Sequence, residues 1–116
     1  MVDAFLTALR AGDFEGLLAV LDPDVVVRID GAAAAPGAAR VVRGAANWAR
    51  GAITFAQAAR FVQPALVDGG VGLVLAPGGR LQRVLRMTLK NGKVAQVEVI
   101  AESERLRELA LAVLND

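Results

Sequence analysis

Apolar residues recur at helical spacing at the start of the chain. Val2, Phe5, Leu6 and Leu9 lie three or four residues apart, which predicts an amphipathic helix. Gly12 stands where a helix commonly ends in a left-handed residue, so we expect the helix to end there.

A second short helix and a strand follow. Asp13 is placed to cap this helix, and Asp22-Pro23 should end it because proline cannot continue the hydrogen-bond ladder. The run from Val25 to Asp30 then predicts a strand. The apolar positions of the helix are Leu17, Leu18 and Leu21.

The middle of the chain predicts a loop followed by a third helix. Residues 31–39 are rich in alanine and glycine and contain Pro36, which is typical of a loop. From about residue 44 to residue 59, apolar positions again share one helical face. They are Trp48, Ala52, Phe55, Ala56 and Ala59.

The second half changes to runs rich in valine and leucine, separated by tight-turn signals at 68–70, 77–79 and 91–92. These signals predict an antiparallel meander and then a final helix from about Ser103. The predicted strands are 61–67, 71–76, 81–90 and 93–101, and the helical stripe is Leu106, Leu109, Ala110 and Val113. The order predicts one α+β domain spanning residues 1–116.

Composition narrows the chemistry. The 116 residues include no cysteine and no histidine, so disulfides, zinc–thiolate sites and imidazole catalysis are excluded, and we expect neither a metal nor a cofactor. A net charge of +1 with dispersed arginines is not typical of a nucleic-acid-binding protein. About a fifth of the chain is alanine, a composition that favours small core contacts.

The chain shows no signal for a membrane. Residues 1–4 lack the basic-then-apolar pattern of a signal peptide, and no apolar run approaches the roughly 18 residues needed to span a bilayer. We therefore expect a cytoplasmic protein.

Several motifs, in order, resemble one family. The opening 2–18 with its Ala-Gly-Asp-Phe-Glu-Gly-Leu-Leu ending, then Leu-Asp-Pro-Asp-Val at 21–25, resembles the start of SnoaL-like domains of the nuclear transport factor 2-like superfamily. Similar motifs stand at 40–45, 92–94 and 101–106. The resemblance is greatest to the C-terminal domains of SigJ-type extracytoplasmic-function RNA polymerase sigma factors. It implies a curved antiparallel sheet wrapped around the N-terminal helices as a cone, with a C-terminal helix.

The resemblance also implies function and partners. It suggests a non-catalytic regulatory or ligand-sensing domain that acts on transcription by protein contact, through sigma factor regions or RNA polymerase. A small apolar ligand and a homodimer are further expectations, without direct nucleic-acid or membrane binding. One sigma-fused group carries Asp-Gly-Gly-Gly-Lys and Asn-Pro-Asp-Lys-Leu motifs, and this chain departs from them at 30–34 and 101–106. The chain holds no counterpart of the promoter-binding sigma regions, so we expect an excised domain or a free-standing relative.

Two residues frame the expected pocket. Arg83 interrupts an apolar strand face, so it should either pair with a carboxylate, line the cone mouth, or lie at the sheet edge. Trp48 is either plain core or a wall of a ligand cavity. The candidate pocket residues are Arg28, Trp48, Phe55, Arg83 and Met87.

An alternative is a small cyclase, isomerase or epoxide hydrolase-type enzyme that uses a pocket carboxylate. Asp30 and Glu98 are its candidates, and Arg28 could complete an Asp-Arg-Asp-like relay; the missing tyrosine argues against a ketosteroid isomerase-like site. Strand alternation places Arg28 and Asp30 on one face, which is either catalytic or simply solvated.

A third possibility is an oligomerisation scaffold. Val97 and Val99, or Val84 and Thr88, could supply a dimer surface, because alternation alone does not say which sheet face is inside.

Overall fold

The computed structural model describes residues 2–33 and 39–113. Its α-helices are α1 (Val2–Ala11), α2 (Phe14–Val20), α3 (Ala45–Ala52) and α4 (Ser103–Glu108). Its strands are β1 (Leu21–Ile29), β2 (Arg40–Arg43), β3 (Val62–Val67), β4 (Gly70–Leu75), β5 (Arg83–Lys90), β6 (Lys93–Ile100) and β7 (Leu111–Val113). Three 3₁₀ turns are η1 (Ile53–Phe55), η2 (Ala58–Phe61) and η3 (Pro77–Gly79).

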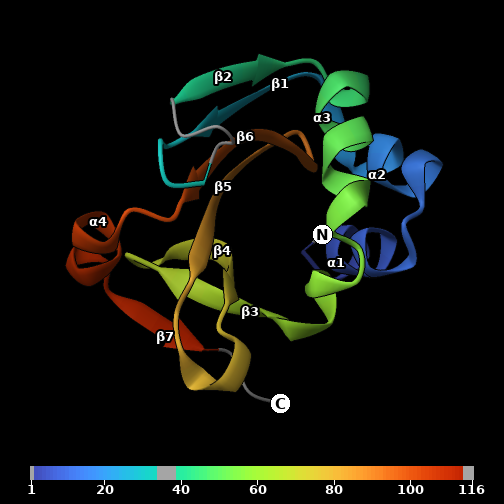
Figure 1. Cartoon of the computed structure of the whole chain (residues 1–116). Coiled ribbons are helices and arrows are strands. Elements are labelled where there is room, and N and C mark those ends of the chain that lie inside the picture. Colours follow the sequence, from blue (N-terminus) through green and yellow to red (C-terminus); the bar gives the residue numbers. More distant parts are fainter. Residues whose placement is uncertain (1, 34–38, 114–116) are drawn as a thin grey trace.

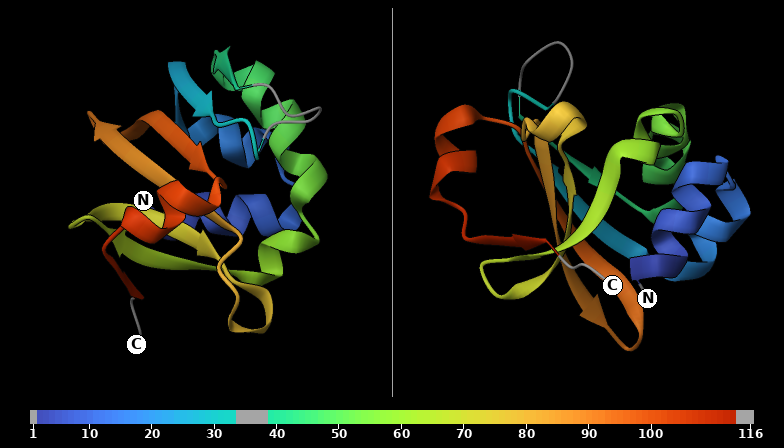
Figure 2. Two further views of the ribbon diagram at one scale, coloured as in Figure 1. Left: turned by 60° about the vertical axis from the view of Figure 1, so that its left-hand side comes forward. Right: turned by 90° about the horizontal axis from the view of Figure 1, so that it is seen from below.

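One curved sheet organises the chain (Figure 1). Its strand order is β2-β1-β6-β5-β4-β3-β7, and the expected meander from β3 to β6 is confirmed. The pairing of β1 with β6 is parallel, which an all-antiparallel expectation missed. Figure 2 shows α1, α2 and α3 on the concave side of the sheet and α4 on the other side.

Local signals explain the turn between the first two helices. Gly12 has a φ of 63°, and the N–H groups of Gly12 and Asp13 donate to the carbonyls of Leu9 and Ala8. This is a Schellman ending, which a left-handed glycine favours. The Asp13 carboxylate then accepts from the N–H of Gly16 at 3.0 Å and caps α2, as predicted.

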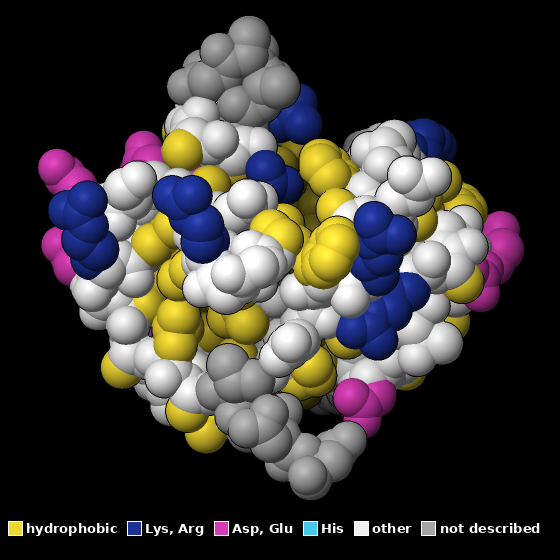
Figure 3. Space-filling view, turned by 60° about the horizontal axis from the view of Figure 1, so that its bottom comes forward, with side chains coloured by type: hydrophobic (Ala, Val, Ile, Leu, Met, Phe, Trp, Pro, Cys, Tyr) yellow, Lys and Arg dark blue, Asp and Glu magenta, His cyan; other side chains and the backbone are white. Residues whose placement is uncertain are grey.

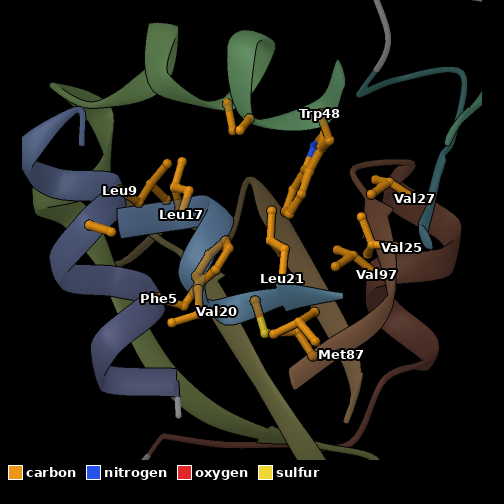
Figure 4. Packing of buried hydrophobic residues seen from close by; sticks show 14 of the residues in the cluster. Phe5, Leu9, Leu17, Val20, Leu21, Val25, Val27, Trp48, Met87 and Val97 are labelled. Carbon is orange, nitrogen blue, oxygen red and sulfur yellow. The ribbon is translucent and has the colours of Figure 1, made fainter. Parts of the chain in front are cut away.

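The main core fills the concave side (Figure 4). The rings of Phe5 and Trp48 stack with their centroids 5.7 Å apart, joining α1 to α3. Val25 and Val27 of β1 are fully buried beneath the helices. The residues of β1 that alternate with them therefore lie on the convex face.

A second, smaller core lies on the convex face. Ala65, Val67, Val74, Val84 and Ile100 are buried there, and α4 and the segment after it pack against them.

The final helix is shorter than predicted. α4 ends at Glu108, and Leu111–Val113 form β7, because the open edge of β3 offers backbone partners to this segment.

Two other elements differ from expectation. The predicted helix 44–59 is α-helical only to Ala52 and continues as the turns η1 and η2, which leave the Phe55 side chain half exposed. β2 was not predicted, because the short Arg-Val-Val-Arg sequence does not alternate between polar and apolar residues; it pairs with β1 at the sheet edge. Most of the predicted loop 31–39 lies outside the described residues.

The valines considered for a dimer surface are not accessible. Val97 and Val99 are buried in the concave core, and Val84 is buried in the convex core. Of this set, only Thr88 is exposed. Across 2–33 and 39–113, the structure has no helix with both the length and the apolar character needed to cross a membrane.

Gly72 is required where β4 passes close to its neighbours. An added Cβ would lie 2.5 Å from the Leu85 carbonyl oxygen and 2.7 Å from Cγ2 of Val67. We therefore expect Gly72→Ala to lower the free energy of unfolding by about 1–3 kcal/mol, measured by urea denaturation.

Gly51→Ala is the matched control for that substitution. An added Cβ at Gly51, within α3, meets no atom within 4 Å. It should raise the free energy of unfolding by about 0.5–1 kcal/mol, because alanine loses less chain entropy than glycine. Equal effects at the two glycines would contradict the close approach at β4.

Candidate functional site: an apolar cavity at the cone mouth

A cavity of about 280 Å³ lies between the concave sheet face and the helices. Its walls come from α1, α3, the turns η1 and η2, and strands β1, β2, β3, β4, β5 and β6. The large apolar lining residues are Phe5, Leu9, Ile29, Trp48, Phe55, Val62, Leu75, Leu85 and Val99. Small residues, namely Ala33, Gly51, Ala52, Ala58 and Ala59, leave the space that bulkier side chains would fill.

Three of the lining residues that the structure describes are polar: Arg40, Thr54 and Arg83. The Thr54 hydroxyl already donates to the carbonyl of Gly51 at 2.6 Å. The guanidinium carbon of Arg83 lies 5.3 Å from the centre of the Phe55 ring, within cation–π range. Among the described residues, no Asp or Glu lines the cavity.

Arg10 holds one wall of the cavity in place, a role that the sequence did not reveal. Its Nε donates to the Ala59 carbonyl at 3.1 Å and its Nη2 to the Val62 carbonyl at 2.6 Å. These bonds fix the turn η2 and the start of β3 against α1. The only signal in the sequence was that Arg10 lies in the last turn of α1. That position indicates a favourable interaction with the helix dipole and does not predict hydrogen bonds to η2 and β3.

Of the five candidate pocket residues, three lie together. Trp48, Phe55 and Arg83 line the cavity. Met87 shares the concave face of β5 but is buried in the core beside Val20 and Leu21, outside the cavity lining (Figure 4). Arg28 is exposed on the convex face, where it is in register with Glu98. Arg40 also lines the cavity and was missed, because its strand was not predicted.

Asp30 follows β1 and is only 6% exposed, so it is not on a solvated face. Its Oδ2 accepts from the N–H groups of Ala101 and Glu102 at 2.8 and 3.0 Å, and its Oδ1 accepts from Ala33 at 2.9 Å. Burial by itself raises the pKa of the Asp30 carboxyl. The three backbone donors and the Arg105 guanidinium outweigh burial and hold that pKa below its usual value.

Glu98 belongs to an ion-pair chain on the convex face. It pairs with Arg105 at 2.5 Å and with Arg86 at 3.4 Å, and Arg86 also pairs with Asp68 at 2.7 Å. The hydrogen bond that Arg105 donates to the Glu98 carboxylate is the main cause that raises the pKa of Arg105. Neither Asp30 nor Glu98 lines the cavity, so the predicted relay with Arg28 is not assembled there.

The chain is similar to a sigma factor over most of its length. It is 30% identical, over 90% of its residues, to the extracytoplasmic function RNA polymerase sigma factor SigJ of Mycobacterium tuberculosis. The crystal structure of SigJ matches 90% of this chain with a TM-score of 0.72. The chain is a SnoaL-like domain of the nuclear transport factor 2-like fold, related to the C-terminal domain of SigJ. This SnoaL-like domain spans 38% of the SigJ sequence and 42% of the SigJ chain in the crystal structure.

More distant structures share the fold alone. A nuclear transport factor 2-like protein from Burkholderia xenovorans LB400 is 22% identical, with a TM-score of 0.55, and the match covers 91% of this chain and 89% of the other. A de novo designed protein with a curved β-sheet is 17% identical, with a TM-score of 0.61, and the match covers 91% and 85%. No protein-family model matches the sequence. The predicted α+β cone is thus confirmed.

The position of Asp30 predicts a structural rather than a catalytic effect of Asp30→Asn. An amide cannot accept at both of its ends, so at least one buried N–H loses its acceptor. We expect the free energy of unfolding at neutral pH to fall by about 1–3 kcal/mol in urea titrations. Asp24→Asn is the control, because Asp24 is exposed and should change stability little.

The same carboxyl gives a pH dependence with a defined sign. Its folded-state pKa lies below its unfolded value of 3.8, so its stabilisation is present above that value and is lost as the pH falls through the folded-state pKa. The stability difference between wild type and Asp30→Asn should therefore shrink on acidification below about pH 4. A difference that stays constant down to pH 2 would show that the carboxylate charge is not responsible.

Proposed function

We propose that this SnoaL-like domain is a regulatory, ligand-sensing module that binds a small apolar molecule in its cavity. The observation that carries the proposal is the cavity lining. Aromatic and aliphatic side chains surround a volume of about 280 Å³, and no Asp or Glu among the residues that the structure describes lines it. General acid–base chemistry by a pocket carboxylate has no group to use among these residues. Relationship to SigJ supports a role in transcription, exerted by contact with sigma factor regions or RNA polymerase.

The two faces of the sheet suggest how a ligand in the cavity could affect a partner. The concave face holds the cavity, and the convex face carries α4 and the Asp68–Arg86–Glu98–Arg105 ion pairs. β5 and β6 contribute side chains to both faces, so a ligand that orders their concave side chains also affects the same strands where α4 packs on them. Such a ligand shifts the equilibrium between two conformations of the domain only if it binds one conformation more tightly than the other.

Binding is tested by filling the cavity. Ala52 lies on the inner side of α3 and is 8% exposed, and Ala52→Leu adds apolar volume there. With the neutral fluorescent probe N-phenylnaphthylamine, we expect binding to the wild type and about tenfold or more weaker binding to Ala52→Leu. Ala112→Leu, on an exposed position of β7, is the control and should bind the probe normally.

A structural control accompanies this measurement. Urea titrations should show that Ala52→Leu remains folded, because the new side chain enters space that is already empty. Undiminished probe binding to the folded variant, or no binding to the wild type, would contradict a ligand cavity.

The regulatory part is tested separately in the source organism. A chromosomal Ala52→Leu substitution should change the levels of a set of transcripts, and Ala112→Leu should not. Identical transcript profiles in wild type and Ala52→Leu cells would reject transcriptional sensing while leaving ligand binding in place.

A further inference from the structure

Among the residues that the structure describes, the charged side chains that line the cavity are all positive. Arg40 and Arg83 are the ionisable side chains of its lining, and among residues 2–33 and 39–113 neither forms a salt bridge. Arg86 and Arg105, on the convex face, are both paired with carboxylates. Two cationic groups beside an apolar cavity attract anions and disfavour cations.

Figure 3 shows the consequence on the surface. Hydrophobic side chains surround a hollow, basic side chains lie beside it, and acidic side chains lie toward the outline of the molecule. The half-exposed ring of Phe55 and the guanidinium of Arg83 meet at the cavity, with 5.3 Å between the guanidinium carbon and the ring centre. An apolar wall and a cationic group thus lie next to each other at the cavity.

The two arginines approach from different strands. Arg83 begins β5 and projects to the concave face with Leu85, whereas Arg40 begins β2 at the sheet edge, with β1 and β6 between them. Arg83 is partly buried, so a hydrogen bond to it is less screened by solvent than one to the exposed Arg40. A guanidinium offers paired donors that match a carboxylate.

We propose that the ligand of this cavity is an anionic amphiphile: an apolar chain or ring system that fills the cavity and ends in a carboxylate held by Arg83, with Arg40 adding long-range attraction. This inference rests on the proposed ligand-sensing function and names the chemical class of its ligand.

Three probes built on a chain of ten carbons test the class: decanoate, decanol and decyltrimethylammonium. Isothermal titration calorimetry at neutral pH should show that decanoate binds wild type about tenfold or more tightly than decanol, and that the cation binds most weakly. Added salt should weaken decanoate binding and leave decanol binding unchanged.

Substitutions assign the preference to the cavity arginines. Arg83→Gln should weaken decanoate about tenfold and leave decanol unchanged, and Arg40→Gln should have a smaller effect in the same direction. Arg28→Gln is the matched control, because Arg28 is exposed on the convex face, away from the cavity. This substitution removes the same positive charge as Arg83→Gln. It should leave both ligands unaffected.

The outcomes separate the two proposals. If decanol and decanoate bind equally, or if Arg28→Gln weakens decanoate as much as Arg83→Gln does, the anionic class is wrong and the apolar cavity function stands. If neither these probes nor N-phenylnaphthylamine binds the wild type, the proposed function falls together with this inference.

Discussion

The buried carboxylate of Asp30 fixes the part of the fold on which the cavity depends. It accepts hydrogen bonds from the turn that follows β1 and from the two residues that follow β6, and it lies 3.6 Å from Arg105 of α4. Because β1 and β6 are parallel, their ends meet at one edge, and a single side chain can join them. Ile29, one residue earlier, points to the opposite side of the sheet and lines the cavity.

Elements with short-range signals were predictable. The Gly12 ending, the Asp13 cap and the Asn91-Gly92 turn each depend on contacts within a few residues, and all lie where the sequence placed them. The end of the chain was not predictable in this way. Its apolar spacing fits a helix through Val113, but β3 has an open edge, and pairing with that edge satisfies backbone groups that helical periodicity does not consider.

The site was predictable only where local chemistry determined it. Trp48, Phe55 and Arg83 were identified from bulk or from charge on an apolar face, and all three line the cavity. The placement of Arg28 and Asp30 required the sheet order, because strand alternation defines two faces without saying which is concave. The donors to Asp30 at Ala101 and Glu102 lie about 70 residues away, beyond any local pattern.

A net charge of +1 conceals a separation of charge across the sheet. On the convex face, Asp30, Asp68 and Glu98 compensate Arg86 and Arg105, so these ions hold strands and α4 together. On the concave face the lining has guanidinium groups and no described acid. The carboxylates that suggested catalysis are thus used for structure. Their absence from the lining also leaves Arg83 without a carboxylate partner there among the described residues. The convex ion pairs and the anion selectivity that we propose for the cavity therefore have one origin.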